Sequence, residues 1–141
     1  MREILFRGKQ KGIMNWVEGT GIFTDGINTW LSANEPNRPI AYGLKHKIVL
    51  SETVGQFTGL TDKNGKKIFE GDIVRVLGNQ QVDDWKNVDY VALIAFLDGG
   101  FCAIDGTVEE HGFRRYALAR MDFSLEIIGN QFDNPELLEN P

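Results

Sequence analysis

The residues closest to a chemical signature lie around one polar turn, Asp62-Lys63-Asn64-Gly65, which is followed by Glu70. A calcium loop holds its ion with oxygen ligands at alternating positions and a bidentate Glu at the twelfth. Here Glu70 is only the ninth residue counted from Asp62, and Lys66 and Lys67 would place two cations inside the loop. The spacing therefore predicts a hairpin turn and no metal site.

The other nucleophiles and proton carriers form no catalytic set. His46 and His111 lie in polar stretches without a second His, Cys or carboxylate at ligand spacing, so neither supports acid–base chemistry. Cys102 lies between two apolar residues, where a buried and inert thiol is expected, because activation needs a cationic and partly exposed setting. No serine stands in a nucleophile elbow, and no glycine pair precedes the Lys-Ser/Thr of a phosphate loop. We expect no catalytic residue, no metal and no cofactor, and a protein that is not an enzyme.

Aromatic residues are more numerous than a small core usually requires. Trp85 lies in a polar loop with Asp83, Asp84 and Lys86, where an exposed indole would be a contact residue, because indoles dominate interface hot spots. The alternative is that Trp85 folds back as a lid on the core. The predicted protein-contact residues are Trp85, Trp30 and Tyr42.

Basic residues gather at two predicted turns and could form one face for nucleic acid. On hairpin tips such residues are more often solvated side chains that protect strand edges. The candidates are Arg7, Lys9 and Lys11 at the first turn and Lys63, Lys66 and Lys67 at the second.

The net charge of −5 is spread unevenly along the chain. Residues 1–50 hold seven Lys/Arg against four Asp/Glu, residues 51–77 hold four of each, and residues 78–141 hold four against twelve. Binding to a phosphate backbone depends on cation density, so the negative total disfavours nucleic acid without excluding a local basic face.

A single cysteine cannot form an internal disulfide, which fits a reducing cytoplasm. The longest apolar run, Val91–Leu97, has seven residues, whereas a membrane span needs about 20. The N-terminus lacks the apolar core of a signal peptide. We expect a cytoplasmic protein without membrane contact.

The elements that must position these residues are mainly short strands. Apolar stretches at 3–7 and 13–17 predict an opening hairpin, and the polar stretch from Thr24 to Pro39 predicts an irregular loop. Asn64-Gly65 predicts a tight reversal, because these residues reach positive φ cheaply. One short helix is predicted between Thr107 and Met121.

Closely spaced strands after residue 50 predict a small antiparallel barrel or sandwich. The runs at 73–77, 88–97, 101–104 and 124–128 are the main ones, and Pro135 can start one helical turn. The expected organisation is a hairpin and irregular loop region at 1–50 and a β domain at 51–141.

Three landmarks in a fixed order carry a family resemblance. They are Arg2–Arg7 (REILFR), the nineteen residues Gln56–Val74, and Glu126–Asn130 (EIIGN) followed by Asn134–Leu138 (NPELL). Together they resemble the YopX family of phage and prophage proteins over nearly the whole chain. The resemblance implies a β-rich fold with an SH3-like barrel in its later part, an origin in a temperate phage or mobile element of a bacterial host, and no known activity.

The expected function is a binding module without catalytic activity that acts through protein contact or self-association, with a homo-oligomer as one expected state. The alternative, from another class, is a nucleic-acid-associated accessory protein that uses the basic hairpin face. One contiguous basic face would favour the second, and an exposed apolar patch would favour the first.

Overall fold

The structure, a computed structural model, describes residues 2–33, 45–78, 88–97, 99–105, 114–117 and 124–139. Antiparallel strands dominate this part of the chain, and its helices are two short 3-10 turns, η2 (Ser51–Thr53) and η4 (Pro135–Leu138). Neither turn is long enough to cross a membrane. The mainly β prediction is therefore confirmed, as is the helical turn that begins at Pro135.

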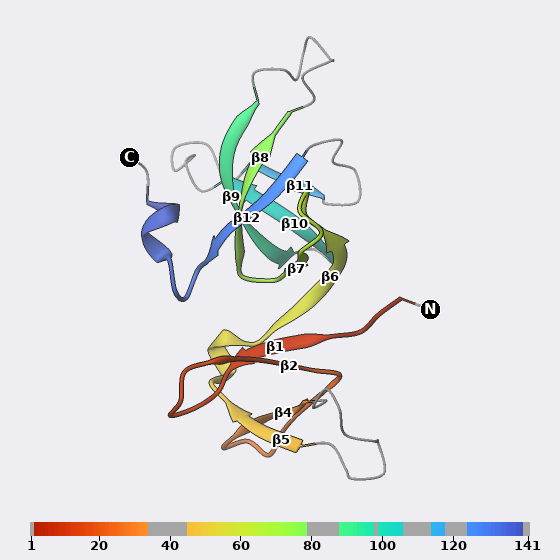
Figure 1. Cartoon of the computed structure of the whole chain (residues 1–141), viewed down its shortest axis with the longest axis vertical. Helices are drawn as coiled ribbons and strands as arrows, with labels where there is room; N and C mark the ends of the chain where they lie inside the picture. Colours follow the sequence, from red (N-terminus) through yellow and green to blue (C-terminus); the bar gives the residue numbers. More distant parts are fainter. Residues whose placement is uncertain are drawn as a thin grey trace. The chain divides into compact units, whose positions relative to one another are not determined.

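The chain divides into two compact units, Met1–Gly59 and Leu60–Pro141, which we name the N-terminal unit and the C-terminal unit. The strands of the N-terminal unit are β1 (Phe6–Lys9), β2 (Trp16–Gly19), β3 (Gly21–Thr24), β4 (Thr29–Ala33), β5 (Lys45–Val49) and the first residues of β6 (Gly55–Thr61), and all but β3 carry labels in Figure 1. β1 and β2 form the predicted opening hairpin.

Two sets of strands make up the N-terminal unit. β1 pairs with β2 and with the start of β6, while β4 lies between β3 and β5. The two sets meet where β5 ends. There Gln10 pairs with Val49, the Lys11 N–H donates to the Ile48 carbonyl oxygen at 2.9 Å, and the Leu50 N–H donates to the Lys9 carbonyl oxygen at 2.9 Å.

The prediction of an irregular loop from Thr24 to Pro39 is wrong for the first half of this stretch. Asp25 Oδ1 accepts the N–H groups of Ile27 and Asn28, each at 2.8 Å, and closes a turn that leads directly into β4. Leu31 of β4 is completely buried. The polar composition did not indicate strand β4. Only the Asp25 carboxylate is needed to form the turn, and only alternate residues of the strand face the core. Residues 34–39 lie outside the described part.

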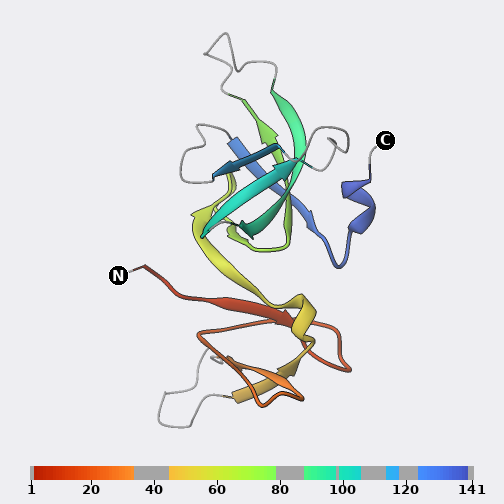
Figure 2. The same ribbon diagram turned by 180° about the vertical axis from the view of Figure 1, so that it is seen from behind.

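The C-terminal unit holds the end of β6, which pairs with β7 (Lys67–Phe69), and a five-stranded antiparallel sheet in the order β11-β10-β9-β8-β12, visible from behind in Figure 2. Its strands are β8 (Asp72–Leu77), β9 (Asp89–Leu97), β10 (Gly100–Asp105), β11 (Arg114–Ala117) and β12 (Ser124–Asn130). A core of aliphatic side chains covers one side of this sheet: Ile68, Val74, Val76, Ala92, Ile94, Ala103 and Leu125. Burial of these side chains is the main stabilising contribution to the unit.

Two expectations for this unit need correction. Arg114–Ala117 pairs with β10 as strand β11, so the helix predicted between Thr107 and Met121 is absent at these four residues, and the rest of that stretch lies outside the described part. The open edge of β10 supplies backbone partners that outweigh the helical spacing of the apolar side chains. The described strands also do not close into a barrel, because β11 and β12 lie at opposite edges of the sheet.

The turn between β6 and β7 agrees with the prediction. The Gly65 N–H donates to the Asp62 carbonyl oxygen at 3.0 Å, and the Asp62 N–H donates to the Lys66 carbonyl oxygen at 2.7 Å. Gly65 has a φ of +81°, in the left-handed region that glycine adopts at no steric cost. Asn64 keeps a negative φ, so only one of the two residues needs the unusual conformation.

We expect Gly65→Val to lower the free energy of unfolding by about 1 to 2 kcal/mol, because a β-branched residue is strained at positive φ. No atom lies within 4 Å of a Cβ placed at Gly65, so the loss isolates backbone strain from steric overlap. Urea unfolding followed by circular dichroism measures the change. Gly100→Ala, at an equally open position with an ordinary φ, is the matched control, and equal stability of both variants would contradict the turn assignment.

Candidate functional site

The two sides of the N-terminal strands carry different kinds of residue. Leu31, Val49 and Thr29 are buried on one side, and Gly8 approaches Val49 so closely that an added Cβ would lie 3.1 Å from the Val49 Cβ. We name this side the inner face. Because neighbouring residues of a strand point to opposite sides, the residues between them face outward.

The outward side, which we name the outer face, combines aromatic and basic side chains. Cross-strand pairs define it on each of the two sets of strands: Phe23 is opposite Trp30 and Trp30 is opposite Ile48 in β3–β5, and Lys9 is opposite Trp16 in β1–β2. Its members are Phe23, Trp30, His46 and Ile48, which we name the aromatic platform, and Arg7, Lys9 and Lys11 with Trp16, which we name the cationic strip.

The aromatic platform consists of three rings and the Ile48 side chain on three adjacent strands. The Phe23 and Trp30 rings stack with their centroids 4.9 Å apart and 15° between their planes. The His46 ring meets Phe23 edge-on at 5.7 Å, and His46 Nδ1 shares a hydrogen bond of 3.1 Å with Ser32 Oγ. Phe23 is 49% exposed and Ile48 is 37% exposed, so the platform offers apolar surface to solvent.

The cationic strip is organised around one indole. Arg7 Cζ lies 4.8 Å and Lys9 Nζ 5.6 Å from the centroid of the Trp16 ring, within the range of cation–π attraction. Such contacts hold long, flexible cationic side chains near fixed positions. The exposed Lys11 continues the strip toward the platform, because its backbone is bonded to Ile48.

Charge on the outer face is predominantly positive. Glu18, opposite Arg7 in the pairing of β1 and β2, is the one carboxylate that the described pairings place among the three cations. By sequence the N-terminal unit holds seven Lys/Arg and five Asp/Glu, a net +2, while the C-terminal unit holds eight and fifteen, a net −7. The outer face is therefore suited to an anionic ligand that also has apolar or planar groups.

The structure describes one of the three predicted protein-contact residues. Trp30 lies on the platform, whereas Trp85 and Tyr42 lie outside the described residues. Phe23, His46 and Trp16 were not among the predicted contacts. The available signal was the alternation in Ile22-Phe23-Thr24 and Trp30-Leu31-Ser32, which the polar turn between them obscured.

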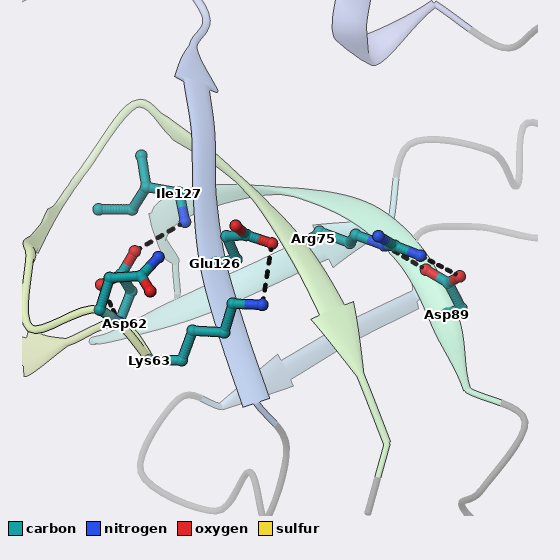
Figure 3. Close-up of polar contacts among 7 residues, drawn as sticks. Asp62, Lys63, Arg75, Asp89, Glu126 and Ile127 are labelled. Atoms are coloured by element: carbon teal, nitrogen blue, oxygen red, sulfur yellow. Dashed lines mark hydrogen bonds and ion pairs between the residues drawn. The ribbon is translucent and has the colours of Figure 1, made fainter.

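The predicted basic residues fall into two groups. Arg7, Lys9 and Lys11 share the outer face, whereas Lys63, Lys66 and Lys67 belong to the C-terminal unit. Lys63 Nζ lies 3.2 Å from Glu126 Oε2 of β12 (Figure 3). On the same sheet, Arg75 binds Asp89 through two hydrogen bonds of 3.0 and 2.8 Å, so cations and carboxylates alternate there.

Asp62, the first residue of the turn that superficially resembles a calcium loop, is 6% exposed and uses both carboxylate oxygens on backbone donors. Oδ1 accepts the N–H groups of Asn64 and Lys66, each at 2.9 Å, and Oδ2 accepts the Ile127 N–H of β12 at 3.0 Å, as drawn in Figure 3. Burial alone would raise the pKa of Asp62, but the three donors and the nearby Lys66 together lower it below its ordinary value. This carboxylate fastens the turn to β12.

Other residues considered for chemistry have structural surroundings. Asp72 is buried and accepts the Phe69 N–H at 2.8 Å at the start of β8. Cys102 is buried, as predicted. His111 lies outside the described residues, and within the described ranges no three His, Cys, Asp or Glu side chains gather as metal ligands would.

Comparisons with known proteins identify a family and a solved structure that are similar to this chain. A family model described as YopX protein matches residues 5–139. The crystal structure of protein EF1440 from Enterococcus faecalis is similar to this chain, with 25% sequence identity and a TM-score of 0.50 over 96% of this chain and 98% of that one. A comparison with curated proteins finds no match.

We expect Asp62→Asn to lower the free energy of unfolding by about 1 to 3 kcal/mol at neutral pH, because an amide leaves at least one of the three N–H donors without an acceptor. The pH dependence has a defined sign. Since the pKa of Asp62 is lowered by folding, the carboxylate stabilises the protein fully above its unfolded pKa, and this contribution is lost as the pH falls through the lower folded pKa.

Urea unfolding of the wild type and of Asp62→Asn at pH 7 and at about pH 3 tests this expectation. The difference between their free energies of unfolding is expected to shrink in acid. Asp89→Asn is the matched control, since Asp89 is half-exposed and pairs with a solvated guanidinium, so its loss has a much smaller effect. A variant as stable as the wild type at pH 7 would show that Asp62 does not fasten the turn.

Proposed function

The chain belongs to the YopX protein family, and from the chemistry of its outer face we propose that it is a binding module without catalytic activity that holds an anionic macromolecule on that face. The supporting observation is the stacked Phe23–Trp30 pair on β3 and β4, of which Phe23 is half-exposed, in the same unit as the three cations Arg7, Lys9 and Lys11. A soluble domain normally buries such rings, and exposed aromatic residues beside arginine and lysine are typical of contact surfaces.

Two classes of partner have the required chemistry. One is protein: an acidic segment with apolar side chains would fit, and a second copy could supply it, because the units carry net charges of opposite sign, +2 and −7. The other is nucleic acid, which the cations around Trp16 favour. Both place the partner on the outer face, so one experiment tests the face itself.

The proposal has three further parts. We propose an SH3-like relationship for the C-terminal unit, supported by the meander of β8 to β11 and the return of β12 to pair with β8. We also propose a phage or prophage origin, supported by the family resemblance. A location in the cytoplasm of the bacterial host fits the single cysteine, which is buried and forms no disulfide.

Site-specific photo-crosslinking in living bacterial cells tests the contact face. A photoreactive benzoyl-phenylalanine replaces Phe23 in the full chain, and adducts are separated after irradiation. We expect adducts that contain a second macromolecule, which treatment with protease or nuclease assigns to protein or nucleic acid.

The matched control carries the same photoreactive residue at Phe96, which is 52% exposed and belongs to the C-terminal unit. Adduct yield well above this control supports the outer face as the contact surface. Yields that are equal at the two positions would refute it, because random encounters label equally exposed sites alike.

A further inference from the structure

We infer that the outward edge of β3 binds the same edge of a second copy of this chain, so that two N-terminal units join through one continuous antiparallel sheet. The inference goes beyond the proposed function, because it assigns a contact to a strand edge and not to the outer face. β3 is an end strand of the sheet β3-β4-β5, and in the part of the chain that the structure describes its only strand partner is β4. Three of its four residues, Ile22, Phe23 and Thr24, are exposed.

β3 lacks the features that protect a strand edge from pairing. Proteins usually place charged side chains, prolines or covering segments at such edges. The other end strands of the described sheets each carry at least one charged residue: Glu18 on β2, Lys45 and Lys47 on β5, Lys67 on β7, Arg114 and Arg115 on β11, and Glu126 on β12. The edges of β5 and β12 are also covered in part, by Gln10 and by the Asp62 turn. β3 consists of glycine, isoleucine, phenylalanine and threonine, and it is neutral.

The backbone groups that point to this edge belong to Ile22 and Thr24. The Asp25 N–H donates to the Asn28 carbonyl oxygen at 3.3 Å and closes the hairpin of β3 and β4. Because the direction of N–H and C=O groups alternates along a strand, those of Phe23 face β4 and those of Ile22 and Thr24 face away from it. Among the described residues, no backbone group meets them, so the edge can accept a further strand.

A second copy fits this edge in a register that symmetry defines. With Phe23 opposite Phe23 of the second copy, Ile22 lies opposite Thr24 of that copy, and these two residues exchange both N–H···O bonds. The two-fold axis repeats the exchange on the other side of Phe23, so the outward backbone groups of both copies are satisfied. A neutral edge meets its own copy without the repulsion that identical charges cause when they lie directly opposite each other.

The side chains give a second reason for a copy of this chain as the partner. The Phe23 ring stacks on Trp30 with the centroids 4.9 Å apart, and it is 49% exposed at the end strand of the sheet. Opposite residues of a non-hydrogen-bonded pair have Cα atoms about 4.5 Å apart, so the Phe23 rings of the two copies come into contact. A strand of another protein needs its own aromatic residue at this position, whereas a second copy supplies one by symmetry.

Analytical ultracentrifugation of the full chain tests the contact. One short strand makes a small interface, so we expect a weak dimer that dissociates on dilution through the micromolar range. Ile22→Pro removes the outward N–H and should weaken the dimer at least about tenfold, because each half of the interface loses a hydrogen bond. Ile22→Ala is the matched control: it shortens the same side chain, keeps the N–H and should retain the dimer. Circular dichroism verifies that each variant is folded.

Two charged variants test the register. Phe23→Lys and Phe23→Glu each place like charges opposite each other across the two-fold axis and should dissociate the dimer, whereas an equimolar mixture should restore it as a heterodimer. Phe96→Lys, at an equally exposed ring of the C-terminal unit, should dimerise as the wild type does. These variants do not depend on proline, so they decide the result if Ile22→Pro does not fold.

The outcomes separate this inference from the proposed function. A dimer that Ile22→Pro and the single charged variants weaken, and that the mixture restores, supports the inference. A chain that stays monomeric well above micromolar concentration, a dimer that these variants leave intact, or a mixture that restores no dimer would overturn it. A monomer that still gives strong photo-adducts at Phe23 with another macromolecule overturns this inference and leaves the outer face as a contact surface. Phe23 adducts that contain only a second copy of this chain support the inference and leave the outer face without a separate ligand.

Discussion

The outer face depends on the register of β1 against the end of β5. The pairing of Gln10 with Val49, supported by the Lys11–Ile48 and Leu50–Lys9 hydrogen bonds, places Arg7 and Lys9 on the same side as Trp30 and Ile48. A slip of one residue would turn every side chain of β1 to the other side and bury the cations against Leu31. Gly8 permits this register, because any larger residue would meet the Val49 side chain.

The C-terminal unit is organised by a different constraint, a buried carboxylate. Asp62 accepts three backbone N–H groups, one of them from Ile127, and the Lys63 N–H donates to the Leu125 carbonyl oxygen at 2.8 Å. The turn thereby satisfies backbone groups of β12 on the side away from β8, where an exposed strand edge would otherwise invite aggregation. A motif with the composition of a metal loop thus has a fully structural use.

The sequence predicts local chemistry better than it predicts long-range pairing. The positive φ of Gly65 and the buried thiol of Cys102 follow from residue type and immediate neighbours. Strand β4 and strand β11 were missed because their stability comes from partners elsewhere in the chain, which a local pattern does not display. Trp30, Arg7, Lys9 and Lys11 of the outer face are among the predicted contact residues, but their outward orientation on two different sets of strands follows only from the strand pairings.

The net charge of a whole chain is a poor guide to its ligands when its units differ in charge. A total of −5 argues against a polyanionic ligand, yet it combines a unit of +2 with a unit of −7. Within the N-terminal unit, the strand register gathers three cations on one side, so the potential met by a ligand is that of the outer face and its nearest neighbours within a Debye length. In the proposed binding module, the acidic unit affects mainly the affinity for an anionic partner and the salt dependence of that affinity, and the rings and cations of the outer face determine which partner binds.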